Sequence, residues 1–460
     1  MSRLDLVIRG ASVVQPEGYP GAGIERCDLG IAEGRIVALG PELAEPALEE
    51  LDARGLLAFP GILDAHVHFN QPGRTHWEGL ASGSAALAAG GGTAFFDMPL
   101  NSLPPVLDRA GLALKRAQAR RFSRLDFALW GGLTPLNLDT LGELAEAGAI
   151  GFKAFLCASG VDEFPATSDP AILRRGMKRA AELGLPVAVH AEDDALAGRL
   201  LAEARARGEE DAASWLATRP VEVELLAIER ACELAGETGC RLHVVHVSSP
   251  EGLAAIALAR KRGVDVSAET CPHYLLLGAE DVPRLGAIAK CAPPLRDEAR
   301  RQELWRRLEA GEVDTLGSDH SPSPPGLKRG GDFFRLWGGI SGCQHGFPLL
   351  LSAALERAPA AQALPRMAAL LAANAARRFR LDHRKGRLAP GLDADLCLLE
   401  IGSEHVLDNT DLLYRHRQGP YHGRPCRVRV VRTLSRGRTV YPGPDSAPDR
   451  QAQYLSPRPQ

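Results

Sequence analysis

Two histidines with one residue between them are the first groups whose spacing suggests chemistry. His66 and His68 lie near the end of the apolar run Ile62–Phe69, which predicts a buried strand. Residues i and i+2 of a strand point to the same side, so both imidazoles should face one way. Two neutral imidazoles at this spacing can chelate a divalent metal ion. The alternative is a pair of core histidines that hydrogen-bond within the protein.

Residues of similar chemistry follow other apolar runs. His190, His246 and Asp319 each end or follow a separate predicted strand. Active sites of barrel enzymes lie at the carboxyl ends of the strands, where these side chains would converge. Each has a structural alternative on its own, such as helix N-capping for Asp319. Together they predict one metal site, whereas His243 falls on the opposite strand face and is expected to pack in the core.

Asp319 is also the candidate catalytic residue. A carboxylate that binds a metal and reaches the water bound there can take up a proton and later deliver it to a leaving nitrogen. No Ser/His/Asp or Cys/His grouping competes with this arrangement. Cys271 and Cys291 have no activating base nearby in the sequence and are expected to line the site.

Lys153 differs from the other six lysines because it lies between Phe152 and Phe155 in a predicted strand, whereas the others have polar or charged neighbours. An unpaired ammonium is costly to bury, and a barrel has no edge strand where it could be exposed. This predicts a charge partner, a lowered pKa or a covalent modification. A lysine of lowered pKa can take up carbon dioxide, and the resulting carbamate could bridge two cations.

Eight apolar runs in the centre of the chain are separated by segments that are mostly rich in Ala, Leu and Arg. The runs are Ile62–Phe69, Thr93–Met98, Leu125–Leu133, Ile150–Leu156, Pro186–His190, Arg241–Val247, Val264–Thr270 and Thr315–Ser318. Such alternation predicts an α/β protein with a (β/α)₈ barrel. A doubly wound open sheet is the alternative, but no GxGxxG motif follows the first run.

The two ends of the chain share a different pattern, of short strands separated by turns. Examples are Leu4–Arg9 and Cys27–Ala32 near the start, and Ala394–Leu399 and Arg427–Leu434 near the end. We therefore expect the ends to meet in one small β-sandwich domain, made of residues 1–58 and 386–443. Residues 59–385 would form the barrel, and residues 444–460, rich in Pro, Asp, Gln and Ser, would be a disordered tail.

The composition is that of a soluble globular protein. The 460 residues have a formal net charge of -3, which provides no global field for nucleic acid or an anionic membrane. No apolar stretch of about 18 residues predicts a membrane span. Nine cysteines without a CxxC pair argue against a disulfide scaffold and for a reducing compartment. We therefore expect a cytoplasmic protein without nucleic-acid or membrane partners.

The motifs together resemble the amidohydrolase superfamily, in particular the cyclic amidases, which include dihydroorotases, hydantoinases or dihydropyrimidinases, and allantoinases. The resemblance covers residues 4 to 441. It implies one divalent ion, most often zinc, held by His66, His68, Lys153 and Asp319, and a second held by Lys153, His190 and His246. In this family the bridging lysine is carboxylated and an aspartate shuttles the proton, here Asp319. The resemblance also implies a homotetramer.

The expected substrate depends on smaller differences within this group. Dihydroorotases carry an arginine two residues after the HxH motif, where this chain has Asn70, and an asparagine where it has Ala292. Loss of the arginine removes a strong bond to a substrate carboxylate. The segments 71–79, 98–101 and 337–340 resemble allantoinases, whose substrate is a small, uncharged ring. Asn101 and Ser321 would contact that ring. The alternatives are a hydantoinase or dihydropyrimidinase, or a scaffold protein without catalytic activity.

Overall fold

The predicted barrel forms the larger part of the molecule. The structure, a computed structural model, describes residues 3–443 and 452–458. The barrel strands are β6 (Ile62–Val67), β7 (Gly92–Asp97), β8 (Asp126–Leu129), β9 (Gly131–Gly132), β10 (Phe152–Phe155), β11 (Val187–His190), β12 (Leu242–Val244), β13 (Val266–Thr270) and β14 (Thr315–Leu316). All neighbouring strands pair in parallel, in the runs β6 to β8 and β9 to β14.

Two local features complete this ring of strands. A single residue, Trp130, separates β8 from β9, so the two short strands together occupy the third barrel position. Just beyond β14, His320 pairs with Val67, and its carbonyl oxygen accepts a hydrogen bond of 2.8 Å from the His68 backbone N–H. This pairing joins the last strand to the first and confirms the (β/α)₈ barrel.

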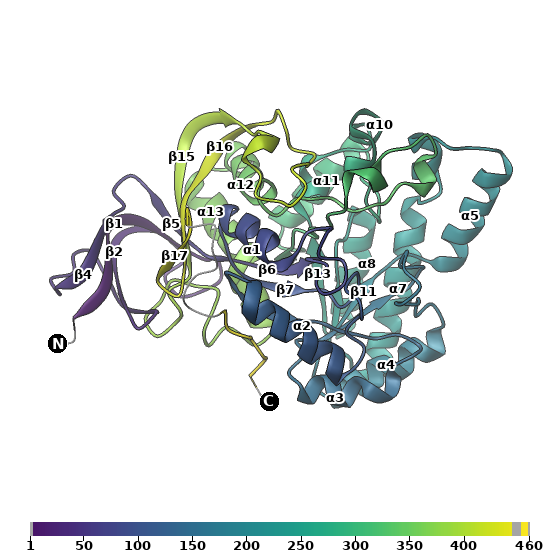
Figure 1. Cartoon of the computed structure of the whole chain (residues 1–460), viewed down its shortest axis with the longest axis horizontal. Coiled ribbons are helices and arrows are strands. Elements are labelled where there is room, and N and C mark those ends of the chain that lie inside the picture. The colour runs from purple at the N-terminus through teal and green to yellow at the C-terminus, as the bar shows by residue number, and fades with distance from the viewer. Residues whose placement is uncertain (1–2, 444–451, 459–460) are drawn as a thin grey trace.

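Helices cover the outside of the barrel, as Figure 1 shows for α2, α3, α4 and α7. The helices are α1 (Leu80–Ala89), α2 (Arg109–Phe122), α3 (Leu141–Glu146), α4 (Pro170–Glu182), α5 (Asp194–Ala206), α6 (Ala212–Ala217), α7 (Val221–Thr238), α8 (Pro250–Lys261), α9 (Pro272–Leu276), α10 (Asp281–Leu285), α11 (Glu298–Glu309), α12 (Gly346–Arg357), α13 (Ala360–Ala368) and α14 (Asn374–Arg378). Among the described residues, no helix combines the length and the apolar character needed to cross a membrane.

Sequence signals explain where these helices begin and which face they bury. The Ser249 hydroxyl caps α8 by accepting a hydrogen bond of 3.1 Å from the Gly252 N–H. Helix α4 begins with a proline after a capping aspartate and buries Leu173 and Met177 at helical spacing. The side chains of the barrel mouth are thus held by strands that are fixed from outside by capped, amphipathic helices.

Both ends of the chain build a β-domain beside the barrel, as predicted. Its strands are β1 (Leu4–Gln15), β2 (Gly23–Ala32), β3 (Arg35–Gly40), β4 (Ala47–Asp52), β5 (Leu57–Pro60), β15 (Leu396–Val406), β16 (Pro425–Ser435) and β17 (Arg438–Tyr441). They form one hydrogen-bonded sheet in the order β17-β16-β15-β5-β1-β2-β3, with β4 on β1, rather than two separate sheets. Ile8, Leu29 and Leu398 belong to its apolar core. Figure 1 shows this sheet at one end of the molecule.

The end of the chain differs from the predicted disordered tail. The backbone of Gln453 and Leu455 hydrogen-bonds to both polar groups of Phe127 at the start of β8. Leu455 is 1% exposed, and the Tyr454 hydroxyl donates to the Gly148 carbonyl at 2.6 Å. The prediction of disorder is therefore wrong for residues 452–458. Ala452, Tyr454 and Leu455 are enough to hold this otherwise polar segment against the barrel. Residues 444–451 and 459–460 of the predicted tail lie outside the described residues.

A buried ionic cluster joins the barrel to the β-domain. The Lys385 Nζ atom lies 2.8 Å from Asp126, 3.0 Å from Asp393 and 2.6 Å from Asp395. Arg436 lies 3.1 Å from the same oxygen of Asp126. Asp126 begins β8, whereas Asp395 immediately precedes β15, so the cluster connects strands of the two domains.

Candidate metal centre

Three of the predicted ligands meet at the carboxyl end of β6. The Nε2 atoms of His66 and His68 lie 3.3 Å and 3.4 Å from the Oδ1 atom of Asp319. All three residues are buried. Burial raises the pKa of Asp319, but the hydrogen bond from His68 and the charges of His68, His273 and Lys153 together outweigh it. The pKa therefore lies below its usual value and the carboxylate is favoured.

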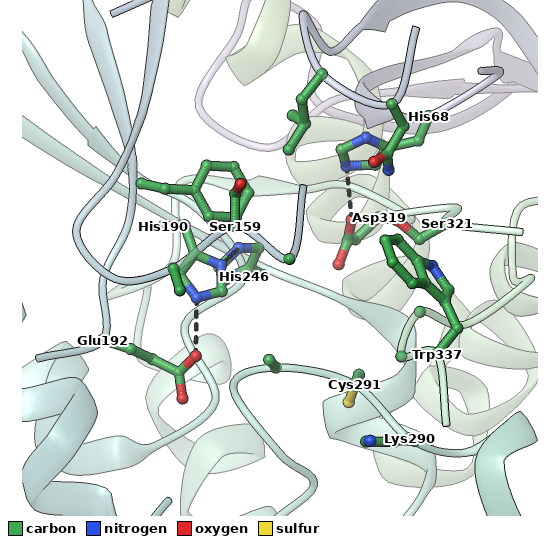
Figure 2. A pocket seen from close by; sticks show the side chains of 18 of the residues that line it. His68, Ser159, His190, Glu192, His246, Lys290, Cys291, Asp319, Ser321 and Trp337 are labelled. Carbon is green, nitrogen blue, oxygen red and sulfur yellow. Dashed lines mark hydrogen bonds and ion pairs between the residues drawn. The ribbon is translucent and has the colours of Figure 1, made fainter. Parts of the chain in front are cut away.

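Two more predicted ligands meet at the ends of β11 and β12. The Nδ1 atom of His190 lies 3.1 Å from the Nε2 atom of His246. The other ring nitrogen of His190 lies 2.8 Å from the Glu192 carboxylate, a contact drawn in Figure 2. Because a carboxylate accepts the proton of that nitrogen, the Nδ1 lone pair of His190 faces His246. Burial lowers the pKa of both imidazoles and favours the neutral form that binds metals.

The two groups are neighbours. The ring of His66 lies 5.5 Å from that of His68 and 5.4 Å from that of His246, measured between centroids. The ring of His246 lies 4.7 Å from that of His190, which stacks on Phe155 at 4.6 Å. The imidazoles therefore form one row. In Figure 2, His190 and His246 lie on one side of the pocket and His68 and Asp319 on the other.

Lys153 lies near this row of imidazoles, because its Nζ atom is close to the Phe155 ring, which stacks on His190. Its charge is among the causes that lower the pKa of His66, His190 and His246. The side chain is 0% exposed, and its Nζ atom has no hydrogen-bond partner within residues 3–443 and 452–458. It lies 5.0 Å from the Phe155 ring in a cation–π contact. Burial lowers the pKa of Lys153 to about 8.

The distances fit metal ligands. An ion with bonds of about 2.0–2.2 Å to nitrogen and oxygen leaves about 3.0–3.5 Å between neighbouring ligand atoms. The three contacts of 3.1, 3.3 and 3.4 Å fall in this range. His66, His68 and Asp319 could hold one ion, and His190 and His246 another. The amine of Lys153 has no hydrogen-bond partner among the described residues. Its modification could supply a ligand to both ions.

Two carboxylates that support the imidazoles were missed in the sequence. Glu269 of β13 lies 2.9 Å from the Nδ1 atom of His66 and 3.4 Å from the Nε2 atom of His243. Glu192, quoted only as part of a motif, binds Arg219 at 2.6 Å as well as His190. A charged residue inside the apolar run that contains Glu269 was the available signal. His243 is buried, as expected for a core residue, and it shares Glu269 with His66.

Arg219 keeps Glu192 ionised. Burial raises the pKa of Glu192, but the Arg219 charge and the His190 hydrogen bond outweigh it and lower the pKa to about 2. An ionised acceptor fixes the ring orientation and the tautomer of His190, as such carboxylates do for metal-binding histidines. The centre therefore has an outer layer of charged groups that orient its imidazoles.

A pocket of about 340 Å³ opens above the centre. Asn101, Ser321 and Cys291 line it together with His66, His68, His190, His246 and Asp319. Cys271, which the sequence also suggested, is fully buried and is not among the lining residues. The pocket contains both candidate substrate residues, but the structure does not assign them a contact with a substrate.

The backbone is strained around the same centre. Four of the seven non-glycine residues with positive φ in the described part of the chain are Asn70, Asn101, His246 and Asp319, with φ between 41° and 63°. Such conformations are costly for residues other than glycine and cluster at functional sites. The sequence gives no signal for this strain, which sets the directions of two candidate ligands.

A family model described as "Amidohydrolase family" matches residues 57–440. Among curated proteins, the chain is 51% identical to an allantoinase of Deinococcus radiodurans, over 99% of both chains. It is 52% identical to an allantoinase of Rubrobacter xylanophilus, over 96% of this chain and 95% of that one. An allantoinase of Escherichia coli is 41% identical over 95% of both chains.

Solved structures of related proteins match the whole molecule. The L-hydantoinase (dihydropyrimidinase) of Arthrobacter aurescens is similar with a TM-score of 0.93 and 31% identity, over 98% of this chain and all of that one. The dihydropyrimidinase of Brevibacillus agri has a TM-score of 0.86 and 28% identity, over 98% of this chain and 96% of that one. The barrel and the β-domain are thus arranged as in proteins of this kind.

Proposed function

The chain belongs to the amidohydrolase family, and we propose that it is an allantoinase that uses two divalent metal ions to hydrolyse the ring amide of allantoin to allantoate. The observation that carries this proposal is 51% identity to a curated allantoinase over 99% of both chains. The convergence of the candidate ligands at the barrel mouth supports a hydrolytic centre of the same type.

The proposed ligands divide into two sets that share a lysine. His66, His68 and Asp319 would hold one ion, and His190 and His246 the other, with carboxylated Lys153 between them. The lysine reacts as a neutral amine with carbon dioxide, forms a carbamate anion and releases a proton. Its buried, unpartnered Nζ atom and its lowered pKa support this modification. Zinc is the ion we propose, because imidazole and carboxylate ligands suit it.

Two ions at this place would supply a water acidic enough to attack near neutral pH and would polarise the ring carbonyl. The residues of the chain complete the reaction. Asp319, whose carboxylate form is favoured by His68, His273 and Lys153 together, accepts one proton of the attacking water. It then delivers that proton to the ring nitrogen as the carbon–nitrogen bond breaks. The second proton of the water is released to solvent, so the products are a carboxylate and a neutral ureido group.

The pocket suits an uncharged ring. Asn101 has a buried Oδ1 atom without a hydrogen-bond partner among the described residues, which we propose accepts an N–H of the substrate. Ser321, which also lines the pocket, would contact the ring. The arginine and lysine residues that line the pocket already have protein partners. Arg219 binds Glu192, Lys290 donates to three carbonyl groups, and Arg335 lies 3.1 Å from Asp332. Asn70, at the position of the dihydroorotase arginine, donates to the Pro322 carbonyl.

A substrate panel with a metal count on the same preparation tests the proposal. We expect the highest kcat/KM for allantoin among allantoin, hydantoin, dihydrouracil and dihydroorotate, and two divalent ions per chain by elemental analysis. Preference for hydantoin or dihydrouracil would favour the alternative function, a hydantoinase or dihydropyrimidinase, which the similarity to solved structures of that kind supports. Absence of stoichiometric metal and of turnover would instead indicate a scaffold protein.

We also propose a homotetramer in the cytoplasm, without nucleic-acid or membrane partners. The tetramer follows from the family resemblance alone. All nine cysteines are free and buried, which agrees with a reducing compartment. Light scattering of the purified enzyme measures the oligomer directly.

A further inference from the structure

One wall of the pocket has little regular structure of its own. We call residues 333–339 the pocket wall; Phe334, Leu336, Trp337, Gly338 and Gly339 all line the pocket. Only one short 3₁₀ turn, Phe333–Arg335, lies within it. At one end, the next residue, Ile340, accepts a backbone hydrogen bond of 2.9 Å from Ser321, beside the metal centre. A segment of this kind needs support from elsewhere to keep one shape.

That support comes from two buried lysines. Lys290 Nζ donates to the carbonyl oxygens of Phe333 at 2.7 Å, Phe334 at 3.2 Å and Leu336 at 2.6 Å. Lys328 Nζ donates to the carbonyls of Ala287 at 3.1 Å, Trp337 at 3.3 Å and Gly339 at 2.7 Å. Five of these six bonds therefore end on the wall.

The three carbonyl acceptors around each Nζ atom favour the ammonium form, which burial opposes. An –NH₃⁺ group has three donors, and each lysine meets three acceptors, so every proton has a partner and none remains to bind a substrate. Lys290 and Lys328 are 5% and 9% exposed, and neither forms an ion pair with a carboxylate among the described residues. Burial lowers the pKa of Lys290 to about 8 and that of Lys328 to about 7.

The Lys290 Nζ atom also lies 5.0 Å from the Trp215 ring and 5.1 Å from the Phe333 ring. Buried charges held by carbonyl dipoles and ring faces, without a carboxylate, are an expensive way to stabilise a loop, which suggests that the shape they impose is used. Gly339 and Trp337 of the wall have different neighbours. Gly339 is close to Ser321 and the metal centre, whereas Trp337 packs against Trp77 of the first βα loop, with ring centroids 4.9 Å apart. In Figure 2, Trp337 lies on the same side of the pocket as Ser321 and Asp319.

We infer that Lys290 and Lys328 are positioning residues that fix the pocket wall, and that the wall determines recognition of the substituent projecting from the reacting ring. This inference rests on the proposed function for the choice of substrates. The ring amide must reach the metal centre. The ureido arm of allantoin therefore lies against residues of the wall that are farther from this centre, such as Trp337. A substrate without an arm makes no such contact.

The first experiment compares Lys328→Met and Lys290→Met with Lys178→Met, a change at an exposed lysine of α4. In the two wall variants we expect KM for allantoin to rise about tenfold or more, with kcat and the KM for hydantoin within about threefold of wild type. Metal content stays unchanged. Amides 333–339 should exchange hydrogen about tenfold faster, as measured by mass spectrometry.

Unchanged exchange, or faster exchange with unchanged KM for allantoin, overturns the inference. An equal loss on allantoin and hydantoin, or a loss of metal, also overturns it, because the lysines would then act on the centre. If wild type does not prefer allantoin, the proposed function fails, yet the exchange measurement still shows whether the two lysines hold the wall.

A second experiment uses wild type and does not depend on the folding of a variant. Acetic anhydride neutralises lysines, and only Lys178 and Lys261 of the seven are exposed, so they react first. We expect Lys290 and Lys328 to react about tenfold more slowly, and KM for allantoin to rise with their acetylated fraction, measured by peptide mass spectrometry. Full acetylation of both lysines at constant KM contradicts the inference.

Discussion

Two buried lysines of this protein have opposite surroundings. Lys153, at the barrel mouth, is 0% exposed and has no hydrogen-bond partner in the part of the chain that the structure describes. Lys385, at the junction of the domains, is 2% exposed and contacts three carboxylates. Burial lowers the pKa of Lys153 to about 8. Burial acts in the same direction on Lys385, but its aspartates outweigh it and raise that pKa above the usual value. Burial alone therefore does not reveal what a lysine does.

The difference lies in whether the charge is already satisfied. A buried ion with a full set of partners holds segments together and has nothing left to bind. A buried amine without partners is tolerated only where another group completes it, and such exceptions mark functional sites. Lys385 connects Asp126 of β8 with Asp395 next to β15, whereas Lys153 lies among the candidate metal ligands. Each region can be tested by removing its lysine.

The largest effect is expected from Lys153→Ala. Loss of the bridging group should lower kcat/KM by at least about a thousandfold, because the ions would no longer be held together. Metal content should fall in parallel, and added formate or acetate should restore part of the activity by occupying the vacated space. The loss of unfolding free energy of the metal-free protein should be smaller than for Lys385, since the amine has no hydrogen bond to lose among the described residues. Turnover and elemental analysis measure the two effects.

Lys178→Ala is the matched control, because Lys178 is exposed on α4 and should tolerate the change. Full activity of Lys153→Ala, with metal retained, would remove the distinction between the two lysines. It would make Lys153 a structural residue in spite of its missing partners.

Lys385→Met should have the opposite profile. Removal of the ammonium leaves Asp126, Asp393 and Asp395 buried together, and breaking a buried ion pair costs about 3–5 kcal/mol. We expect a loss of unfolding free energy of this size by denaturant titration, with kcat of the folded enzyme within about twofold of wild type. Lys178→Met is again the control. A loss of activity without a loss of stability would assign Lys385 a functional role.

Local patterns in the sequence predicted the barrel and identified the candidate metal ligands. The HxH spacing, the polar ends of the other strands and the aromatic neighbours of Lys153 are local patterns, and they were enough to predict the barrel and to name six candidate ligands. Glu269 and Arg219 were missed because their partners come from other strands and loops. Distances between segments far apart in the chain are not encoded in local spacing.

Which lysines are buried, and whether the end of the chain is ordered, was not predicted from the sequence. Lys115, Lys290, Lys328 and Lys385 were assigned polar surroundings from their sequence neighbours, yet all four are buried, with carboxylate or carbonyl partners supplied by distant residues. The terminal segment failed for a related reason. Its average composition predicts disorder, but Leu455 and Tyr454 find a place at the barrel.

A smaller effect is expected from Leu455→Ala, which tests whether the end of the chain contributes to the barrel. Leu455 is 1% exposed and belongs to a core cluster with Trp130 and Phe379. Truncation should cost about 2 kcal/mol of unfolding free energy, at the low end for leucine because a terminal segment can adjust. Activity should be unchanged, and Leu136→Ala, at a 71% exposed leucine, is the control. A stability equal to wild type would mean that residues 452–458 contribute nothing to the fold.

The smallest effect concerns pH and shows why Lys385 is needed. Burial raises the pKa of Asp126, but Lys385 and Arg436 outweigh it and keep this pKa below its usual value; burial raises that of Asp395 in spite of Lys385. Without the lysine both pKa values should rise further. A carboxyl group whose pKa is higher in the folded than in the unfolded state makes stability fall as the pH rises between the two values.

The destabilisation caused by Lys385→Met should therefore be at least about 1 kcal/mol smaller at pH 5 than at pH 8, because the abandoned aspartates are protonated at the lower pH. The lysine itself adds no slope in this range, since its raised pKa means that its contribution is lost only above about pH 10.5. Denaturant titrations of wild type and variant at both pH values measure the difference. Equal destabilisation at pH 5 and pH 8 would mean that Arg436 already keeps the carboxylates ionised. Lys385 would then not be needed to balance their charge.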